Sequence, residues 1–249
     1  MILYFSATGN SKYVAERIAE ATEDTAVSIE NEETAVKLKS EECLGIVTPV
    51  YFGGLPLPMW NFLERLQLNG HTGYCFAVLT YGYTSGFSAA EVKKLLSEKN
   101  LKLSASFGIQ MPDTWTPVFD VSDPAAVSGT NDASEGRIEE IIHSVKNRET
   151  GVHAVGRYPY FVRLIAKPLY DRARSTEKFY VEDSCIGCGL CAKKCPMQAI
   201  DIEDKKPVWK KDKCALCLRC LHHCPKFAIQ YGNGKTKKHG QYRNPHVKI

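Results

Sequence analysis

Apolar and polar positions along the first 150 residues follow two alternating periods. Short apolar runs predict strands over residues 1–5, 25–29, 43–48, 73–79 and 101–110. Stretches in which apolar residues recur every three or four positions predict helices over residues 12–21, 58–68, 87–99 and 134–148. Strands that alternate with helices indicate the α/β class with a parallel sheet.

The first predicted strand runs into the turn Ser-Ala-Thr-Gly-Asn-Ser at residues 6–11, which begins the first helix. Free backbone N–H groups and the positive end of the helix dipole make such a turn an anion site. Ser6, Thr8 and Ser11 add hydroxyl donors, and Gly9 allows close approach of the backbone. The turn matches neither the G-x4-G-K-S/T nor the G-x-G-x-x-G nucleotide pattern. Plain helix capping is the alternative interpretation.

Two later strands also end in loops, at residues 48–56 and 80–86, and both loops are rich in aromatic residues and glycine. In open parallel α/β sheets ligands bind outside the carboxyl ends of the strands, so we expect the three loops to lie together. A phosphate cradle beside two aromatic loops fits flavin mononucleotide, FMN.

With these loops, residues 1–150 resemble flavodoxin, whose phosphate loop is similar to the turn at residues 6–11. The resemblance implies a flavodoxin-like doubly wound sheet of strand order 2-1-3-4-5 and noncovalently bound FMN. The chain departs from the family pattern because flavodoxins are acidic free carriers, and because the third loop lacks the usual acidic residue. The predicted FMN-binding residues are Ser6, Thr8, Gly9, Asn10, Ser11, Pro49, Val50, Tyr51, Phe52, Gly53, Thr80, Tyr81, Gly82 and Tyr83.

Individual roles follow from the side-chain types in these loops. Tyr51 or Phe52 and Tyr81 or Tyr83 are expected to pack on the flavin faces, with a place at the edge of the core as the alternative. The glycine pair at residues 53–54 can take positive φ, so its peptide group can turn towards flavin N5 and stabilise the one-electron state.

The segment 111–132 holds three prolines, Trp115 and Phe119, and it is too irregular to predict as a helix or strand. A loop of this length in a compact domain is usually functional or disordered. Three roles stay open: a lid on the flavin, a contact with the following domain, or an unstructured insert.

Eight cysteines between residues 185 and 224 form two copies of C-x2-C-x2-C-x3-C-P, offset by 29 residues. The first three cysteines of a copy can wrap one cubane cage, and the fourth then reaches the other cluster. We therefore predict two [4Fe-4S] clusters with crossed ligation. One has the ligands Cys185, Cys188, Cys191 and Cys224, and the other has Cys195, Cys214, Cys217 and Cys220. Zinc knuckles, an alternative, would leave the third and fourth cysteines of each copy unused.

Residues 181–232 resemble the bacterial-type two-cluster ferredoxins, and the pair Ala199-Ile200 of one copy matches Ala228-Ile229 of the other. The whole chain is therefore similar to fusions of a flavodoxin with such a ferredoxin. The expected domains are a flavodoxin-like domain at 1–150, a helical connector at 151–180, a small α+β ferredoxin-like domain at 181–232 and a basic tail at 233–249.

The connector carries an apolar stripe between residues 160 and 170, with basic residues among the apolar ones. Packing of one domain on the other is the expected use of this stripe, and contact with a membrane surface is the alternative. Pro168 is expected to end or kink the helix. Cys43 and Cys75 lie in predicted strands as small buried hydrophobic residues. His222 and His223 are expected to face solvent.

Composition adds constraints on charge and location. Residues 205–249 hold 12 Lys and Arg against one acid, a net charge of +11, which leaves −7 for the rest of the +4 chain. Two clusters of about −2 each would bring the total near zero, so we expect basic residues to offset cluster charge rather than to bind nucleic acid. The absence of a long apolar run and of a leader predicts a cytoplasmic protein without a membrane span. Oxygen-sensitive clusters suit a reducing interior and predict an anaerobic or low-oxygen cell.

These features predict an electron-transfer flavoprotein that relays electrons between two [4Fe-4S] clusters and FMN. Clusters pass single electrons, whereas a flavin takes one or two. The expected partners are redox proteins, a ferredoxin or an oxidoreductase. The alternative is a reductase whose FMN acts on a small organic acceptor and is fed by its own clusters.

Overall fold

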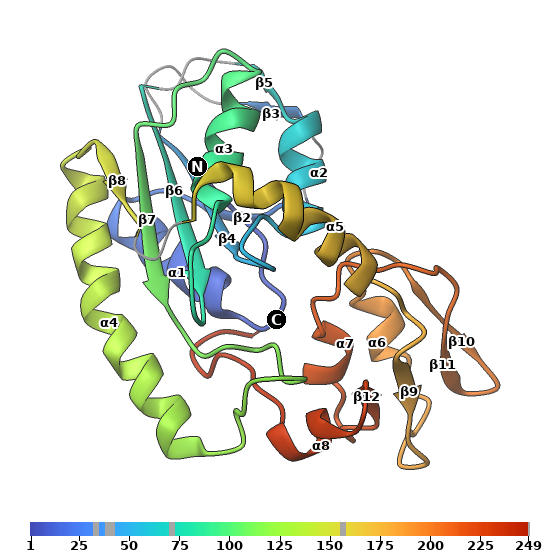
Figure 1. Cartoon of the computed structure of the whole chain (residues 1–249). Coiled ribbons are helices and arrows are strands. Elements are labelled where there is room, and N and C mark those ends of the chain that lie inside the picture. The colour runs from blue at the N-terminus through green and yellow to red at the C-terminus, as the bar shows by residue number, and fades with distance from the viewer. Residues whose placement is uncertain (32–34, 38–42, 70–72, 155–157, 249) are drawn as a thin grey trace.

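The computed structural model describes residues 1–31, 35–37, 43–69, 73–154 and 158–248. Its N-terminal half is built on one parallel sheet of order β2-β1-β4-β6-β7-β8 (Figure 1). The strands are β1 Ile2–Tyr4, β2 Ala26–Ser28, β4 Cys43–Pro49, β6 Tyr74–Tyr81, β7 Ala105–Gln110 and β8 Gly151–His153. The predicted order 2-1-3-4-5 is confirmed, and β8 adds a sixth strand beside β7.

Helices cover both faces of this sheet, as the alternating pattern predicts. α1 (Asn10–Ala21) and α4 (Pro124–Lys146) bury their apolar residues on one face, together with Phe76 and Phe107 of the sheet. α2 (Leu57–Arg65) and α3 (Ser88–Ser97) pack on the other face. Each face thus has its own apolar core, and the loops at the carboxyl ends of the strands stay free to form a site.

Two helix boundaries differ from the prediction by more than two residues. α4 begins at Pro124 instead of residue 134, because Asp123 caps it by accepting a hydrogen bond from the Ala125 N–H at 2.9 Å. The irregular segment is therefore shorter and ends at residue 123. α2 stops at Arg65, and the end of its predicted range becomes the short strand β5 (Gln67–Asn69), which pairs with β3 (Ala35–Lys37).

The connector is only partly helical, which corrects the prediction. Its start forms β8, and its helix α5 (Arg163–Ala173) follows the 3₁₀ turn η1 (Tyr160–Val162) and continues through Pro168. The apolar stripe is not buried as expected, since Leu164 is 74% exposed and Ile165 is 68% exposed. The helix is held instead by cations over the Trp60 ring and by the Tyr170 hydroxyl, which donates to the Ala215 carbonyl at 2.8 Å.

The C-terminal half is a small α+β unit in which the two cysteine copies have similar local structure. β9 (Phe179–Val181) pairs with β12 (Ile229–Tyr231), and β10 (Ile200–Glu203) pairs with β11 (Lys206–Trp209), both antiparallel. The short helices α6 (Leu190–Lys193) and α7 (Arg219–His222) occupy the same position in the two copies. Figure 1 shows this unit beside the carboxyl ends of the parallel strands.

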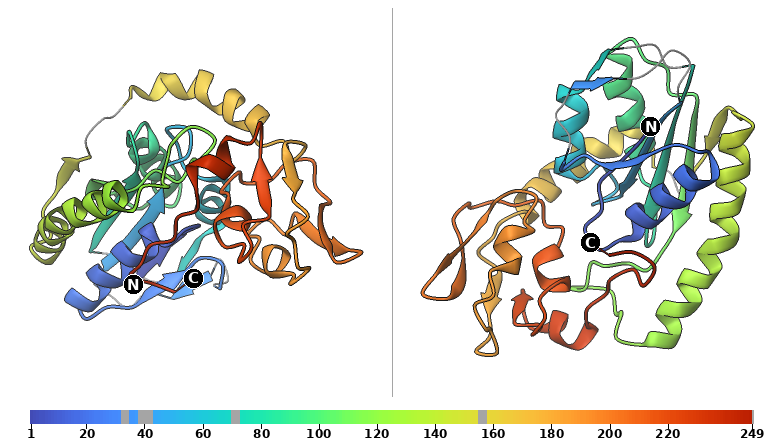
Figure 2. Two further views of the ribbon diagram at one scale, coloured as in Figure 1. Left: turned by 90° about the horizontal axis from the view of Figure 1, so that it is seen from below. Right: turned by 180° about the vertical axis from the view of Figure 1, so that it is seen from behind.

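The basic tail does not hang free. After α8 (Lys235–His239) it returns to the N-terminal half (Figure 2). There His246 stacks on Tyr13 with ring centroids 4.8 Å apart. The Asn244 N–H donates to the Thr8 carbonyl at 2.8 Å. Within the described ranges, no helix has the length and apolar character needed to cross a membrane.

Candidate functional site

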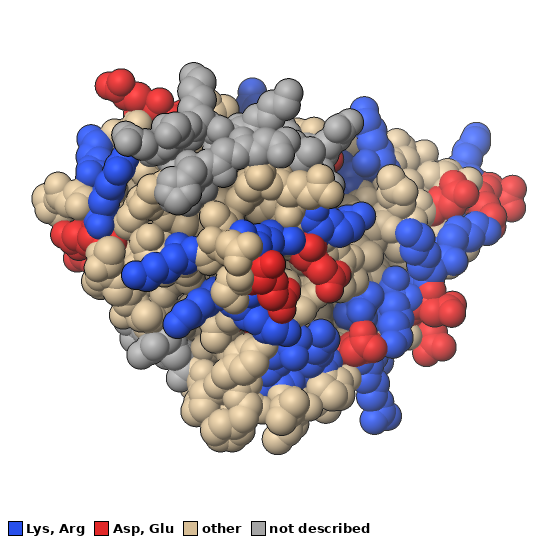
Figure 3. Space-filling view, turned by 90° about the horizontal axis from the view of Figure 1, so that it is seen from above, with Lys and Arg blue, Asp and Glu red and all other residues tan. Residues whose placement is uncertain are grey.

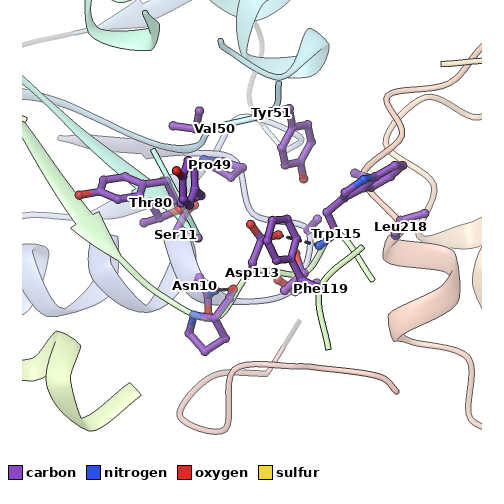
Figure 4. A pocket seen from close by; sticks show the side chains of 18 of the residues that line it. Asn10, Ser11, Pro49, Val50, Tyr51, Thr80, Asp113, Trp115, Phe119 and Leu218 are labelled. Carbon is purple, nitrogen blue, oxygen red and sulfur yellow. Dashed lines mark hydrogen bonds between the residues drawn. The ribbon is translucent and has the colours of Figure 1, made fainter. Parts of the chain in front are cut away.

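A cavity of about 240 Å³ lies at the carboxyl ends of the strands, between the two halves of the molecule (Figure 4). The turn after β1 and the loops after β4 and β6 form its wall on the flavodoxin side. Every predicted FMN-binding residue except Gly9 lines it. Three loops that are far apart in the sequence thus meet at one place, as the sheet topology requires.

The turn at residues 6–11 is ordered by its own hydroxyl groups. Ser6 Oγ accepts a hydrogen bond from the Gly9 N–H at 3.1 Å, and Ser11 Oγ lies 2.8 Å from Thr80 Oγ1 of the next loop. Gly9 has φ +109° at the start of α1, a conformation that favours glycine. Hydroxyl groups and a helix N-terminus on this wall form a donor set that fits a phosphate.

The loop after β4 makes a tight turn that presents an aromatic ring. Tyr51 and Gly54 exchange both backbone hydrogen bonds, at 2.8 and 2.9 Å. Phe52 (φ 51°) and Gly53 (φ 78°) between them both have left-handed backbone. For an aromatic residue this conformation is strained. The Phe52 ring lies 5.2 Å from the Tyr170 ring, between centroids, and this contact helps to hold the turn at the cavity.

The segment 111–123, which the sequence left open, contributes a third side. Pro112, Asp113, Thr114, Trp115 and Phe119 line the cavity. Trp115 contacts both halves, since its ring lies 5.8 Å from Phe52 and 5.6 Å from Tyr231. Contact with the following domain, one of the three open roles, is therefore borne out, and the segment also forms part of the cavity wall. The grouping of a tryptophan and a phenylalanine in this segment was the available signal.

Asp113 is the acidic residue of the cavity wall. It packs against Gly82, where a Cβ atom would lie 2.2 Å from the Asp113 side chain. Burial raises the pKa of its carboxyl, and the hydrogen bond from the Trp115 N–H at 2.9 Å opposes that shift. Tyr83, by contrast, is 77% exposed and lies at the rim.

The C-terminal half, called the cluster half below because it carries the eight cysteines of the two copies, closes the cavity with Leu216, Cys217 and Leu218. Both leucines have left-handed backbone, with φ 54° and 53°. The equivalent positions in the first cysteine copy are Gly187 and Gly189, with φ 67° and 72°. The two copies thus share one backbone conformation, and in the second copy leucine side chains face the cavity in place of glycine.

The cysteines separate into two groups. Cys185, Cys188, Cys191 and Cys224 line one small cavity, with Cys188 exposed. Cys195 and Cys220 pack against the apolar cluster that contains Cys214. Burial raises the pKa of Cys220, the neighbouring Cys217, Cys214 and Cys195 thiols raise it further, and Cys191 of the first group adds the smallest effect. Each group therefore combines three cysteines of one copy with the fourth of the other. This is the grouping that crossed ligation needs.

The backbone around the thiols suits negatively charged sulfur. The Ala199 N–H points at Cys195 Sγ and the Ala228 N–H points at Cys224 Sγ, both at 3.3 Å. Among the described residues, no three His, Cys, Asp or Glu side chains are arranged to hold a single metal ion. A cubane differs from a single ion because each of its four thiolates binds a different iron.

His222 and His223 are buried, so the expectation that they face solvent is wrong. His222 Nε2 lies 2.9 Å from the Thr114 carbonyl, and its Nδ1 accepts the Tyr242 N–H at 3.1 Å. Burial lowers the pKa of His222 to about 4, so the ring is neutral and uses one nitrogen as donor and the other as acceptor. The cysteine repeat could not predict this burial, because a polar residue in such a motif can face either solvent or a second domain, and the sequence pattern is the same in both cases.

Comparisons with known proteins identify a family domain in each half of the chain. The family model of the flavodoxin domain matches residues 1–135, and that of the 4Fe-4S dicluster domain matches residues 177–241. These matches imply a flavin and iron–sulfur clusters as cofactors. No curated protein sequence matches the chain. A solved structure, rubredoxin oxygen:oxidoreductase from the anaerobe Desulfovibrio gigas, is 15% identical with a TM-score of 0.34, and the match covers 59% of this chain and 36% of that one.

Proposed function

Because this chain belongs to the flavodoxin domain family and carries a 4Fe-4S dicluster domain behind that domain, we propose that it relays electrons between two [4Fe-4S] clusters and FMN. The observation that supports this most is the shared wall of the cavity. Cys217, a proposed cluster ligand, lines the same cavity as Tyr51 and Thr8. A cluster bound there would lie next to the flavin.

The residues divide by what they would hold. The hydroxyl groups and N–H groups of residues 6–11 would bind the FMN phosphate, and Tyr51, Phe52 and Trp115 would enclose its ring. When bound, FMN supplies one- or two-electron chemistry and the clusters supply single-electron transfer. Leu216 and Leu218 exclude water from the wall between the two cofactors.

The two cysteine groups differ in how deeply they are buried, and this difference suggests the route of the electrons. Cys214 is buried and its group adjoins the flavin cavity, whereas Cys188 of the other group is exposed. We propose that a redox protein partner exchanges electrons at the exposed group. Electrons would then pass through the inner group to FMN. Covalent fusion keeps donor and acceptor at high effective concentration.

Rapid mixing under anaerobic conditions tests the relay. Protein with both cofactors is mixed with a low-potential reductant over a wide range of protein concentration, and cluster and flavin absorbance are followed. We expect flavin reduction to follow cluster reduction at a rate that does not depend on protein concentration. A rate proportional to protein concentration would mean transfer between molecules and would refute the built-in relay.

A second candidate function is reduction of a small organic acceptor. It is favoured by a cavity of about 150 Å³ that shares Tyr51 and Phe52 with the first and is mainly apolar, with Trp60 and Phe87 in its wall. An acceptor screen with the reduced protein distinguishes the two functions. Multiple turnovers with a small acceptor would support the reductase, and oxidation by protein acceptors alone would support the carrier.

A further inference from the structure

Three consecutive carbonyl groups of the turn at residues 6–11 each accept a hydrogen bond from the C-terminal half. The donors are Arg219 Nη2 to Ser6 at 2.6 Å, His223 Nε2 to Ala7 at 3.1 Å and the Asn244 N–H to Thr8 at 2.8 Å. All three contacts join segments more than 200 residues apart. The turn is thus held from outside the domain to which it belongs.

These contacts fix the direction of the turn's peptide groups. In a planar trans peptide the carbonyl of one residue and the N–H of the next point in opposite directions. Carbonyls held on the side of the cluster half therefore orient the N–H groups of Ala7, Thr8 and Gly9. The N–H groups of Ala7 and Thr8 are then donors of the kind that an anion at such a turn requires, while the Gly9 N–H donates to Ser6 Oγ and keeps the turn closed.

The donors are themselves anchored. Arg219 is only 5% exposed and forms two hydrogen bonds to the Glu30 carboxylate, at 2.7 and 2.6 Å. Asn244 and Tyr242 both donate to Asn10 Oδ1, at 3.2 and 2.7 Å. An arginine or asparagine held in this way loses little further freedom when it orders its acceptor.

Gly9 shows how closely the tail approaches. A Cβ atom added at Gly9 would lie 2.7 Å from the Asn244 Cβ. The glycine is therefore required by the C-terminal segment that packs over the turn. Sequence alone had suggested that its role was to admit the ligand.

Two of the three donors, Arg219 and His223, belong to the second cysteine copy. Arg219 and His223 align with Leu190 and Lys194 of the first copy, whose motif does not line the flavin cavity. At these two positions the hydrogen-bond donors to the turn therefore come from the copy that faces the turn.

We propose that Arg219, His223 and Asn244 are positioning residues that hold the turn in its phosphate-binding conformation, so that flavin affinity depends on the docked cluster half. This inference rests on the proposed FMN site. Binding of the phosphate and docking of the cluster half are then coupled, and such coupling is typically worth about 5- to 150-fold in affinity and is reciprocal.

Comparison of FMN with riboflavin, which lacks the phosphate, separates positioning from general destabilisation. Dissociation constants for both flavins are measured anaerobically by fluorescence titration, with iron content as a check on the clusters. The variants are His223→Ala, His223→Gln, whose amide can still donate, and Asn244→Pro. The last variant lies 20 residues beyond the last cysteine and removes both the N–H donor to Thr8 and the side-chain amide that donates to Asn10. Lys193→Ala is the control, because Lys193 is an exposed residue of the other copy.

We expect His223→Ala and Asn244→Pro to weaken FMN binding about tenfold while riboflavin binding changes less than about twofold. His223→Gln should recover most of the affinity, and Lys193→Ala should match the wild type. Equal weakening of both flavins, or unchanged FMN affinity in both variants with full iron content, would overturn the proposal. Failure of the underlying FMN site looks different, because the wild type itself would then bind riboflavin as tightly as FMN.

Discussion

At the scale of single residues, Leu216 and Leu218 carry a conflict between backbone and side chain. Their left-handed conformation costs about 1–2 kcal/mol for an L-residue, yet both side chains are buried in the wall beside the cavity. The first copy avoids that cost with Gly187 and Gly189. Burial of leucine contributes more than the backbone loses, so the second copy retains the strained residues where a wall is needed.

A comparison of Leu218→Gly with Leu218→Ala measures this backbone cost. Glycine usually destabilises a protein more than alanine, by about 0.5–1 kcal/mol. At φ 53° the order should reverse, and Leu218→Gly should be the more stable variant by about 1 kcal/mol. Chemical unfolding of the cluster-loaded protein, followed by cluster absorbance, gives both values. The usual order, with alanine the more stable, would contradict the strain argument.

Asp113 predicts a pH dependence. Because burial raises its pKa, the native state keeps the proton to higher pH than the unfolded state. The contribution of this group to the free energy of unfolding therefore falls as pH rises from the ordinary value of 3.8 through the raised native pKa. Asp113→Asn should stabilise the protein at neutral pH, and the gain should shrink as pH is lowered towards 3.8.

The control for this prediction is Asp120→Asn in the same segment. Asp120 is exposed, and hydrogen bonding to Ser122 lowers the pKa of its carboxyl, which is the opposite shift. Thermal unfolding across a pH series should show no gain for this variant at neutral pH. A gain of equal size in both variants would mean that overall charge, and not the burial of Asp113, is responsible.

Among the helices and strands, the sequence predicted those whose own residues carry a clear apolar period or a typical turn. Apolar runs gave the five main strands, and the turn at residues 6–11 was found from its glycine and hydroxyl groups. β8 was missed because three exposed residues, Gly151–His153, have no apolar period to detect. The early start of α4 could have been read from Asp123 and Pro124, a typical helix beginning.

Contacts between the halves were beyond sequence reasoning for a physical reason. An apolar stripe such as that of α5 predicts burial, but it does not identify the partner. In the structure α5 is attached through cations and Tyr170, while Leu164 faces outward. His222 and His223 are the opposite case: they are polar residues between two cysteines, yet they are buried against the N-terminal half, which is distant in sequence.

α5 therefore predicts an unequal response to substitution. Leu164→Gln should change the free energy of unfolding by less than about 0.5 kcal/mol, because the side chain is exposed. Tyr170→Ala removes a ring that contacts Phe52 and a hydroxyl bonded to Ala215, so it should cost about 2 kcal/mol or more. Denaturant titration of both variants checks this. A large loss in Leu164→Gln would show that the stripe is covered in solution.

The proposed crossed ligation of two clusters makes a prediction for Cys195→Ser. Cys195 belongs to the first copy by sequence but lies with Cys214, Cys217 and Cys220. We expect the variant to damage the inner cluster, which these four cysteines would hold, and to spare the outer cluster of Cys185, Cys188, Cys191 and Cys224. Iron content and electron paramagnetic resonance are the readouts. Loss of the outer cluster with an intact inner one would show that each copy binds its own cluster.

At the scale of the whole molecule, the basic C-terminal region is paired with acidic groups as well as with the proposed clusters. Lys213 lies 2.9 Å from Asp171 and Lys237 lies 2.8 Å from Glu182, and Lys210 pairs with Glu203. Figure 3 shows Lys and Arg side chains interspersed with acidic ones on the side of the cluster half. These ion pairs offset part of the basic charge of residues 205–249.

The two halves are joined by several independent contacts, which argues for a fixed spacing between the proposed cofactors. Arg219 pairs with Glu30 across the interface, Trp115 contacts rings of both halves, and the tail packs on α1. Buried hydrogen-bonded charges of this kind are costly to separate, because a lost partner leaves an uncompensated charge. Opening of the interface should therefore be rare on the time scale of electron transfer.

A rigid interface and a hinged one differ in their response to solvent viscosity. If domain motion brought the inner cluster to the flavin, the observed rate would be limited by that motion and would fall as sucrose is added. With Cys217 already in the cavity wall, we expect the rate of flavin reduction by the clusters to be insensitive to viscosity. Glu30→Gln, which leaves Arg219 with a weaker partner, should loosen the interface and introduce such a dependence. A wild-type rate that falls in proportion to viscosity would show that the halves separate between transfers, and the contacts described above would then belong to only one of two working arrangements.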